Sequence, residues 1–437
     1  MQDPDYIAPE YSSITSTSSL DYFTKDKFQD QIQRIKDASE VAHKKVDYIT
    51  AHNEEVLYAI EIVEKFLRKS RRICYGGQAI NAHLPAKYKI YDPMYSIPDY
   101  DFFTSNSEKD ITNITKELQN AGFTEISVRE GMHEGTMKVY VDYVPVADIT
   151  VIHPKIYEIL HKRSAVFDGI HYLDANSLRM LMYLELSRPK GEVDRWSKVF
   201  ERLMVFNEFI PIKRCTIKQK KIKMTEQHIR VLVHFCIEHN RIFAGADLID
   251  FYEQSMDQHN VSLDISHKKP ILFFSPDSYK DATQLVTLLR SVDHRKYRIQ
   301  TITIQKSDIV PFFTMITSGR QIIACIIEYS ACHAYVQIPM NKGHIKIASL
   351  DTLISLYFSL GLLHTKLFNI GSMECMASKL VEISMKTRMK YGTSVIPFIS
   401  VTCEGYQKTL PSLIREKVER ITRKRSNDKK KTFKKRR

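Results

Sequence analysis

Three aspartates in this chain have the side-chain type and the spacing to hold divalent cations. Asp99 and Asp101 stand two residues apart in an apolar segment, and Asp148 lies within another apolar segment. Because residues i and i+2 of a β-strand point the same way, we expect Asp99 and Asp101 to share one face. Carboxylate oxygens suit Mg²⁺ or Mn²⁺, which keep coordination positions for water and phosphate oxygens. The three acids therefore predict a metal site that can receive a polyphosphate.

The position of Asp148 within its segment makes it the candidate for the third acid. Residues 136–141 and 144–151 read as two strands joined by a tight turn, which places Asp148 deep in an apolar strand. Burying an unpaired charge is expensive, so a metal or a cation is its expected companion. Asp142 is the competing candidate, but it occupies the turn, where aspartate is an ordinary residue.

Gly76 and Gly77 follow a short apolar segment, Arg72–Tyr75, and precede a segment that reads as a helix. Glycine lets the backbone approach a phosphate closely, and the amides at a helix start attract anions. A glycine pair taken alone indicates only a turn. Beside the three acids, it predicts an elbow that cradles phosphate.

Helical periodicity surrounds these residues and supplies the elements that must position them. A strand from Asp99 to Thr104 is expected to feed a helix that ends before Gly122. Lys198 lies on the last of the expected helices, where it is either a ligand of nucleotide phosphate or an ordinary surface lysine. The helices are expected at residues 25–47, 53–70, 109–120, 176–187 and 193–207.

The positive charge of the chain is concentrated in two segments. The 437 residues carry a net charge of +13, and residues 423–437 hold ten Lys or Arg and one acid. Residues 211–224 hold six Lys or Arg and no acid. A polyanion partner explains such concentration, because each neutralised phosphate releases counterions. The alternatives are a solubilising or nuclear-import tail and a solvated surface.

The remaining composition is that of a globular protein with two or three domains, 43% of its residues being hydrophobic. The longest apolar run, Thr352–Leu363, is shorter than the ~20 residues of a membrane span, and nothing resembles a signal peptide. Seven cysteines without a Cys-x-x-Cys pair predict reduced thiols, with neither a zinc site nor a disulfide framework.

The motifs together resemble one family. The sequences at Tyr75–Ile80, Pro98–Phe103, Thr136–Val139 and Val146–Ile149 are similar to those of the poly(A) polymerase catalytic subunits of asfarviruses, poxviruses and giant viruses. The resemblance covers residues 60 to 210 and implies the nucleotidyltransferase superfold of polymerase beta. This chain departs from many members of that superfold by having Gly-Gly instead of Gly-Ser, and by a long gap between Gly77 and Asp99.

The resemblance implies transfer of AMP from ATP to the 3′ end of mRNA, with release of pyrophosphate. By the same resemblance, Asp99, Asp101 and Asp148 hold two Mg²⁺ or Mn²⁺ ions, and Gly76 and Gly77 contact phosphate. It also implies a viral protein in the host cytoplasm, at the viral factory or packaged in the virion. Work as a homodimer or with a processivity subunit stays open. The rival functions are a tRNA-terminal or small-molecule nucleotidyltransferase and an inactive RNA-binding scaffold.

A comparison of the chain with itself predicts a second, degenerate copy of the fold. Residues 98–110 align with residues 269–281, and residues 75–77 align with residues 243–245. In the second copy Pro270 and Leu272 replace the two acids. We therefore expect an α+β protein in which a catalytic nucleotidyltransferase domain, a helical connector and a degenerate nucleotidyltransferase-like domain follow one another. The expected segments are an arm and helix at 1–52, the catalytic domain at 53–165, the connector at 166–235, the degenerate domain at 236–400 and a basic C-terminal segment at 401–437.

Overall fold

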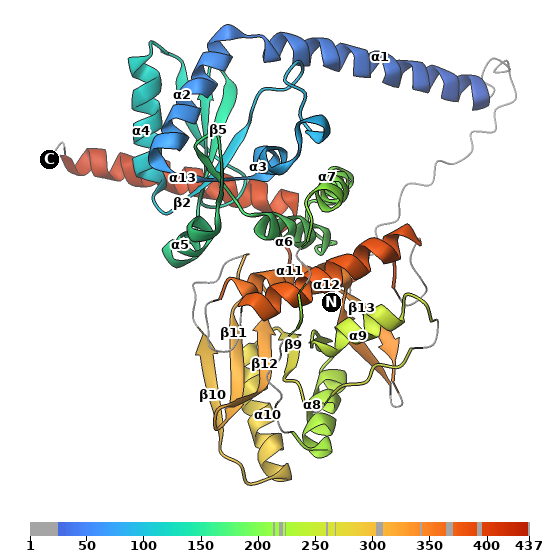
Figure 1. Ribbon diagram of the computed structural model, residues 1–437. Helices are drawn as coiled ribbons and strands as arrows, with labels where there is room; N and C mark the ends of the chain where they lie inside the picture. Colours follow the sequence, from blue (N-terminus) through green and yellow to red (C-terminus); the bar gives the residue numbers. More distant parts are fainter. Residues whose placement is uncertain are drawn as a thin grey trace, which may run out of the picture. The chain divides into compact units, whose positions relative to one another are not determined.

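A computed structural model describes most of the chain (Figure 1). One unit holds the described residues up to Asn53 together with Asp92–Ile97, and a second unit holds the other described residues. In the first unit, α1 (Lys25–Ala51) is exposed from residue 29 to residue 49. The described residues are 25–212, 215–217, 222, 224–258, 261–266, 268–302, 309–340, 343–363, 370–390 and 396–435.

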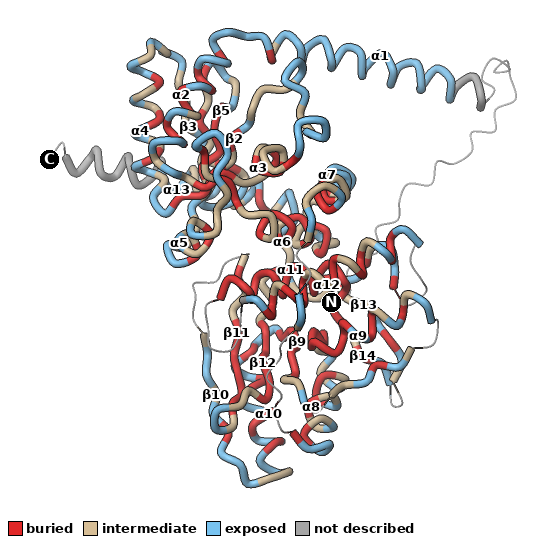
Figure 2. The backbone as a smooth tube through the Cα atoms, viewed as in Figure 1, coloured by how far each residue is buried: buried red, intermediate tan, exposed pale blue. Residues whose placement is uncertain are grey.

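The second unit begins with a mixed sheet in the order β3-β4-β5-β2-β1-β7-β6. Strand β2 pairs with β5 in parallel and with β1 in antiparallel orientation. The inner strands are buried (Figure 2), because both faces of the sheet carry apolar side chains such as Phe102 and Ile149. The strands are β1 (Ile73–Tyr75), β2 (Tyr100–Thr104), β3 (Ile126–Glu130), β4 (Thr136–Val141), β5 (Val144–Val151), β6 (Ala165–Phe167) and β7 (Ile170–Tyr172).

Helices pack on this sheet and lead away from it. The predicted helices are present, with ends that differ by a few residues. Asn106 caps α4 by accepting a hydrogen bond from the Lys109 amide, and α4 ends two residues before Gly122, whose φ is +100°. The elements are α2 (Glu54–Ser70), α3 (Gly76–His83), η1 (Ala86–Tyr88), α4 (Ser107–Asn120), α5 (Pro154–Arg163), α6 (Ala175–Leu186), η2 (Val193–Arg195) and α7 (Trp196–Phe209).

A second sheet repeats the seven strands of the first and adds β15 at its edge, with the order β10-β11-β12-β9-β8-β14-β13-β15. Its central strand β9 pairs with β12 in parallel and with β8 in antiparallel orientation, as β2 does with β5 and β1. Its strands are β8 (Ile242–Phe243), β9 (Ile271–Ser275), β10 (Tyr297–Ile302), β11 (Phe313–Ser318), β12 (Gln321–Glu328), β13 (His333–Pro339), β14 (His344–Ala348) and β15 (Cys403–Glu404).

The helices of this second half follow a sequence order similar to that of the first, except that α5 has no counterpart between β12 and β13. Helix α8 precedes β8, and α10 follows β9 as α4 follows β2. They are α8 (Glu226–Glu238), α9 (Asp247–Gln254), α10 (Ser278–Val292), α11 (Leu350–Gly361) and α12 (Ile370–Met389). The C-terminal helix α13 (Leu410–Lys435) follows β15.

Buried ion pairs confirm that the two halves are copies of one fold. Arg72 makes two hydrogen bonds of 2.8 Å to the carboxylate of Asp110 and so ties the start of β1 to α4. Arg241 binds the carboxylate of Asp281 in the same two-pronged way, tying β8 to α10. The predicted degenerate copy is therefore present. Its start was misaligned by one residue, because strand pairing matches Cys74, not Tyr75, with Phe243.

The domain boundaries predicted from the sequence stay a prediction. The predicted basic cluster lies outside the described residues, at Lys213, Arg214, Lys218, Lys220, Lys221 and Lys223. The apolar run Thr352–Leu363 forms most of α11, which is buried along its whole length. Among the described residues, no helix is long and apolar enough to span a bilayer.

The prediction about cysteines was wrong. The structure pairs Cys332 with Cys403 and Cys215 with Cys375 as disulfides, with Cα–Cα distances of 5.4 and 5.7 Å. The sequence separations, 71 and 160 residues, show why the pairs could not be recognised from local spacing. The three cysteines that stay free, Cys74, Cys236 and Cys325, are buried.

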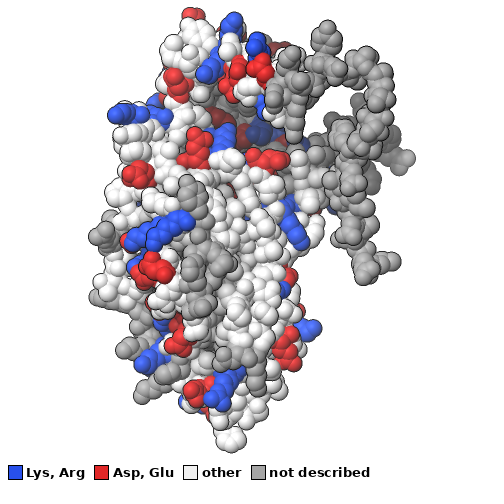
Figure 3. Space-filling view, turned by 90° about the vertical axis from the view of Figure 1, so that its right-hand side faces the viewer, with Lys and Arg blue, Asp and Glu red and all other residues white. Residues whose placement is uncertain are grey.

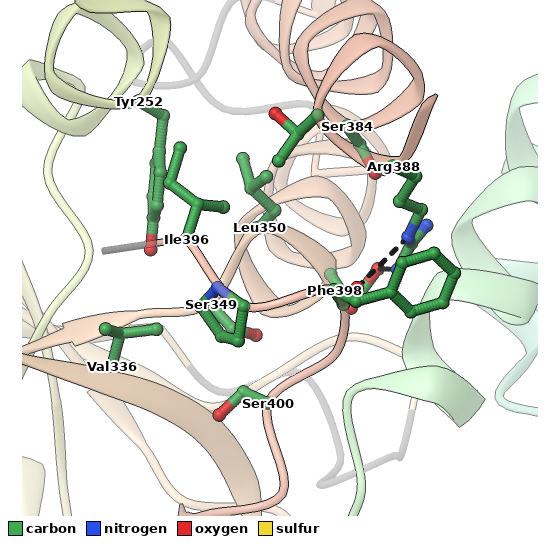
Figure 4. A pocket seen from close by; sticks show the side chains of 12 residues that line it. Tyr252, Val336, Ser349, Leu350, Ser384, Arg388, Ile396, Phe398 and Ser400 are labelled. Atoms are coloured by element: carbon green, nitrogen blue, oxygen red, sulfur yellow. Dashed lines mark hydrogen bonds and ion pairs between the residues drawn. The ribbon is translucent and has the colours of Figure 1, made fainter. Parts of the chain in front are cut away.

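A buried arginine joins the connector helices to the second half. Arg388 of α12 binds Asp351 of α11 at 2.6 Å and donates to the Phe398 carbonyl at 3.3 Å (Figure 4). Its guanidinium also lies over the rings of Tyr183 in α6 and Phe200 in α7, at 6.0 and 5.2 Å. The small pocket of Figure 4 is thus closed on one side by a charge that already has its partners.

Candidate active site

The strand register brings two of the three predicted acids side by side. Asp101 on β2 is the direct partner of Asp148 on the parallel strand β5. Neighbouring strands lie about 4.8 Å apart, and residues in register point to the same face. Asp99 immediately precedes β2 and is exposed, whereas Asp148 is 7% exposed. The sheet therefore presents the acids as a cluster that opens to solvent on the Asp99 side.

The acids act on one another electrostatically. Burial, followed by the charges of Asp99 and Asp148, raises the pKa of Asp101 to about 7. Desolvation and then Asp148 raise the pKa of Asp99. Because Asp99 and Asp101 resist ionisation in this way, an added positive charge would stabilise their charged forms. The electrostatics therefore favour a cation at this place.

Gly76 gives Asp101 the room it needs. Its φ of +71° lies in the left-handed region, and a Cβ at this position would overlap Asp101 Oδ2. A Cβ at Gly77 would overlap the hydroxyl of Tyr91. Both glycines are therefore required by close contacts within the chain. Their contact with phosphate, as the sequence predicts it, stays a prediction.

Asp148 has one protein partner. Lys138 on β4 is its neighbour in register, and the Lys138 ammonium binds Asp148 Oδ2. The other oxygen, Asp148 Oδ1, is buried and has no hydrogen-bond partner in the described part of the chain. Burial lowers the pKa of Lys138 while the hydrogen bond and charge of Asp148 raise it, and the net shift is upward. The charge on Asp148 is thus only partly compensated.

The donor set fits a divalent metal, although it is not arranged as a finished metal centre. Two of the carboxylates are partners in register on parallel strands, the third stands two residues before Asp101 in the sequence, and one buried carboxylate oxygen is unsatisfied. Within the described residues, no group of three or more His, Cys, Asp or Glu is already placed to hold a metal ion. Asp148 is turned toward Lys138 instead, so its carboxylate would have to exchange that partner for the metal.

Basic side chains from η2 and α7 lie within electrostatic reach of the acids. Desolvation, Arg202 and Arg195 lower the pKa of Lys198, while Asp99 acts in the opposite direction, which places Lys198 within electrostatic reach of the acids. Burial raises the pKa of Asp101, and Arg195 likewise lowers it. Arg202 donates to the Tyr91 hydroxyl at 2.8 Å, above Gly77. These cations could receive the negative charge of a triphosphate.

The competing acid has the structural role that the sequence suggested. Asp142 and Tyr143 occupy the two-residue turn between β4 and β5, with φ of +48° and +66°. Such a turn needs left-handed backbone at both positions, which aspartate tolerates better than most residues. Asp142 therefore belongs to the hairpin and not to the acid cluster.

Sequence reasoning missed three residues of the site. Lys138 lies within the recognised Thr136–Val139 motif, and strand alternation could have placed it beside Asp148. Tyr91 and Arg202 gave no such signal, because they are 111 residues apart and meet only in the fold.

The C-terminal helix docks on the same half of the molecule. Arg420 and Lys424 of α13 bind the carboxylate of Glu130 at the end of β3, and Arg420 also reaches the Met132 carbonyl. The hydrogen bond from Lys424 is the main cause that lowers the pKa of Glu130. On the face shown in Figure 3, described Lys and Arg side chains stand among Asp and Glu side chains. The basic tail is therefore a helical continuation of a docked element up to Lys435.

The fold and the acid cluster define a class. The structure resembles the crystal structure of the Megavirus polyadenylate synthase with a TM-score of 0.74 at 16% identity, covering 94% of this chain and 86% of that chain. The chain therefore has the fold of that structure, and its two sheets follow a similar strand order, the first with the acids and the second without them.

The sequence comparisons find similarity to one family. Residues 61–192 match the model of the family described as "Poly(A) polymerase catalytic subunit". A poly(A) polymerase catalytic subunit of Acanthamoeba polyphaga mimivirus, by its curated name, is 24% identical over 247 residues, which are 53% of this chain and 41% of the relative. One of African swine fever virus is 26% identical over 174 residues, covering 38% and 36%. The predicted resemblance to the viral poly(A) polymerase catalytic subunits is confirmed, and the chain spans about two fifths of the length of these relatives.

Proposed function

We propose that this chain is a template-independent polynucleotide adenylyltransferase that adds AMP from ATP to RNA 3′ ends and releases pyrophosphate. The observation that carries the proposal is the pairing of Asp101 with Asp148 across two parallel strands, beside a glycine that leaves room for the Asp101 carboxylate. The family match over the same residues supports it.

The residues of the site divide the work of the reaction. Asp99, Asp101 and Asp148 would hold Mg²⁺ or Mn²⁺, which when bound lowers the pKa of the attacking 3′ hydroxyl and neutralises the triphosphate. Gly76 and Gly77 would let the backbone lie against phosphate. Lys198, exposed beside Asp99, would bind the outer phosphates and stabilise the departing pyrophosphate. Positioning and charge neutralisation suffice, so no nucleophilic side chain is needed.

RNA is the proposed macromolecular partner. Residues 423–437 carry ten of the basic residues of the chain, and α13, which extends to Lys435, is docked on the catalytic half through Glu130. A basic helix held there would keep an RNA strand near the acids by phosphate contacts, without reading its sequence.

A primer-extension assay tests the function. The protein is incubated with a labelled RNA primer, Mg²⁺ or Mn²⁺, and each nucleoside triphosphate in turn. Long extension with ATP alone is expected. Addition of only a few nucleotides to a tRNA end would favour the tRNA-terminal alternative. No incorporation with any nucleotide would reject the polymerase and leave a small-molecule nucleotidyltransferase or an RNA-binding scaffold.

Assembly and location are part of the same proposal. The chain would act alone, as a homodimer or with a separate processivity subunit, and sizing the protein in solution, alone and with RNA, tests the homodimer. We further propose that the protein acts in the host cytoplasm at the viral factory and is packaged in the virion. Immunofluorescence of infected cells and analysis of purified virions test these locations.

A further inference from the structure

The proposed reaction gives no role to one lysine of the site, Lys138. Lys138 projects from β4 beside Asp148, and its side chain is 34% exposed while that of Asp148 is 10% exposed. It binds Asp148 Oδ2 and leaves Oδ1 unsatisfied. The lysine therefore occupies the place that a cation would take on the third acid.

The second half of the molecule gives independent support for linking this lysine to the acids. In the first sheet, register pairs connect Lys138 with Asp148, and Asp148 with Asp101. In the second sheet the corresponding pairs connect Met315 with Cys325, and Cys325 with Leu272. The lysine is thus replaced by an apolar residue in the same copy of the fold that lacks the acids. If Lys138 served only to build the sheet, its counterpart would not need to change with them.

We propose that Lys138 is the resident counter-ion of the acid cluster and that it yields Asp148 to the divalent metal when the metal binds. This inference rests on the proposed function, because it presumes that the acids bind a metal. In the metal-free protein the ammonium offsets the buried charge of Asp148, which otherwise would be costly. The metal must displace it, so Lys138 lowers the affinity for metal while it stabilises the empty site.

Metal affinity, measured without ATP or RNA, tests the exchange. Isothermal titration of the purified protein with Mn²⁺ is compared for the wild type, Lys138→Met and Lys138→Arg. We expect Lys138→Met to bind Mn²⁺ about tenfold more tightly, equivalent to about 1.4 kcal/mol, and to unfold at a lower temperature in EDTA. Lys138→Arg keeps the charge and is expected to stay close to the wild type. Unchanged or weaker binding by Lys138→Met would overturn the inference.

A measurement on the unaltered chain covers the case in which Lys138→Met does not fold. An amine-acylating reagent is applied in EDTA and in Mn²⁺, and the modification rate of each lysine is read by mass spectrometry. Displacement by the metal is expected to raise the rate at Lys138 several-fold, while Lys116, which is exposed on α4, stays the same and serves as the internal control. An unchanged or slower rate at Lys138 contradicts the exchange.

The failure of this inference can be told apart from failure of the proposed function. If the wild type binds Mn²⁺ and Asp101→Asn does not, the acids are a metal site whatever Lys138 does. If Asp101→Asn and Asp148→Asn bind Mn²⁺ as the wild type does, the proposed function itself is lost. In an Asp148→Asn background, Lys138→Met should no longer change the affinity for Mn²⁺, because the partner of the lysine is gone.

Discussion

The sheets of the two halves of this protein share a strand order and differ in the row of side chains that crosses their central strands. Across β4, β5, β2 and β1, the first half presents Lys138, Asp148, Asp101 and Tyr75. The second half presents Met315, Cys325 and Leu272, and the Ala244 amide donates to the Leu272 carbonyl. A charged row that opens to solvent has thus become part of a buried core, in which Cys325 is 1% exposed. The comparison shows that the fold does not depend on the acids.

The largest expected difference between the halves is catalytic. Asp101→Asn should lower AMP incorporation about 10³-fold, because it removes a charge needed by the transition state while keeping the shape of the side chain. The matched change in the second half, Leu272→Met, conserves side-chain volume and should leave the rate within about twofold. Primer extension under ATP saturation measures both. Equal losses in the two variants would show that the second half is part of the active site.

The two halves should lose the same amount of stability when their equivalent ion pairs are broken. Asp110→Ala and Asp281→Ala each leave a partly buried arginine without its carboxylate, and we expect each to lower the free energy of unfolding by about 3 kcal/mol. Hydrogen exchange read by mass spectrometry assigns the loss to α4 and β1 or to α10 and β8. A loss in only one half would mean that the two ion pairs do not have equivalent roles.

The basic tail continues a helix that docks on the half with the acids. Removing residues 425–437 leaves Arg420 and Lys424 on Glu130 and takes away most of the tail charge. Affinity for a single-stranded RNA should fall about tenfold at low salt, and the dependence of affinity on salt should become shallower. A filter-binding titration over a range of salt concentrations measures both. An unchanged salt slope would assign the tail to another role, such as nuclear import.

The smallest expected effect is on the pH dependence of stability. The pKa of Asp101 is raised to about 7 in the folded protein and is ordinary in the unfolded chain. The folded protein therefore holds a proton that the unfolded chain releases, and stability from this group is present below pH 4 and is lost as the pH rises through 7. Asp101→Asn should remove this slope and raise the unfolding temperature in EDTA at pH 8 by about 2 °C.

The predicted pH dependence has a matched control in the hairpin turn. Asp142→Asn changes an acid of the hairpin turn outside the cluster, so it should leave the pH profile of the metal-free protein unchanged. If Asp101→Asn and Asp142→Asn give the same profile as the wild type, the burial and repulsion ascribed to Asp101 are not felt by the folded protein.

Much of the catalytic half could be predicted from the sequence, because its signals are local. Alternation in Thr136–Val151 fixed the hairpin, and the separation of two residues placed Asp99 and Asp101. The duplication was also visible, since the strand-to-helix turns at Phe102 and Phe273 lie on equivalent strands. The copies begin in register only to within one residue, because a two-residue strand such as β8 carries too few side chains to set the alignment.

What could not be predicted depends on contacts between distant residues. The hydrogen bond from Arg202 to Tyr91 and the disulfide between Cys332 and Cys403 join positions with no shared local pattern. The salt bridge between Lys138 and Asp148 is intermediate, since the hairpin register sets it and the hairpin was recognised. It was overlooked because a strand lysine is ordinarily a solvated residue.

The position of Arg388 has a mechanical consequence. The Arg388 guanidinium binds Asp351 and also lies on the rings of Tyr183 in α6 and Phe200 in α7. Helices α6 and α7 and the acid-free half should therefore move together as one rigid body.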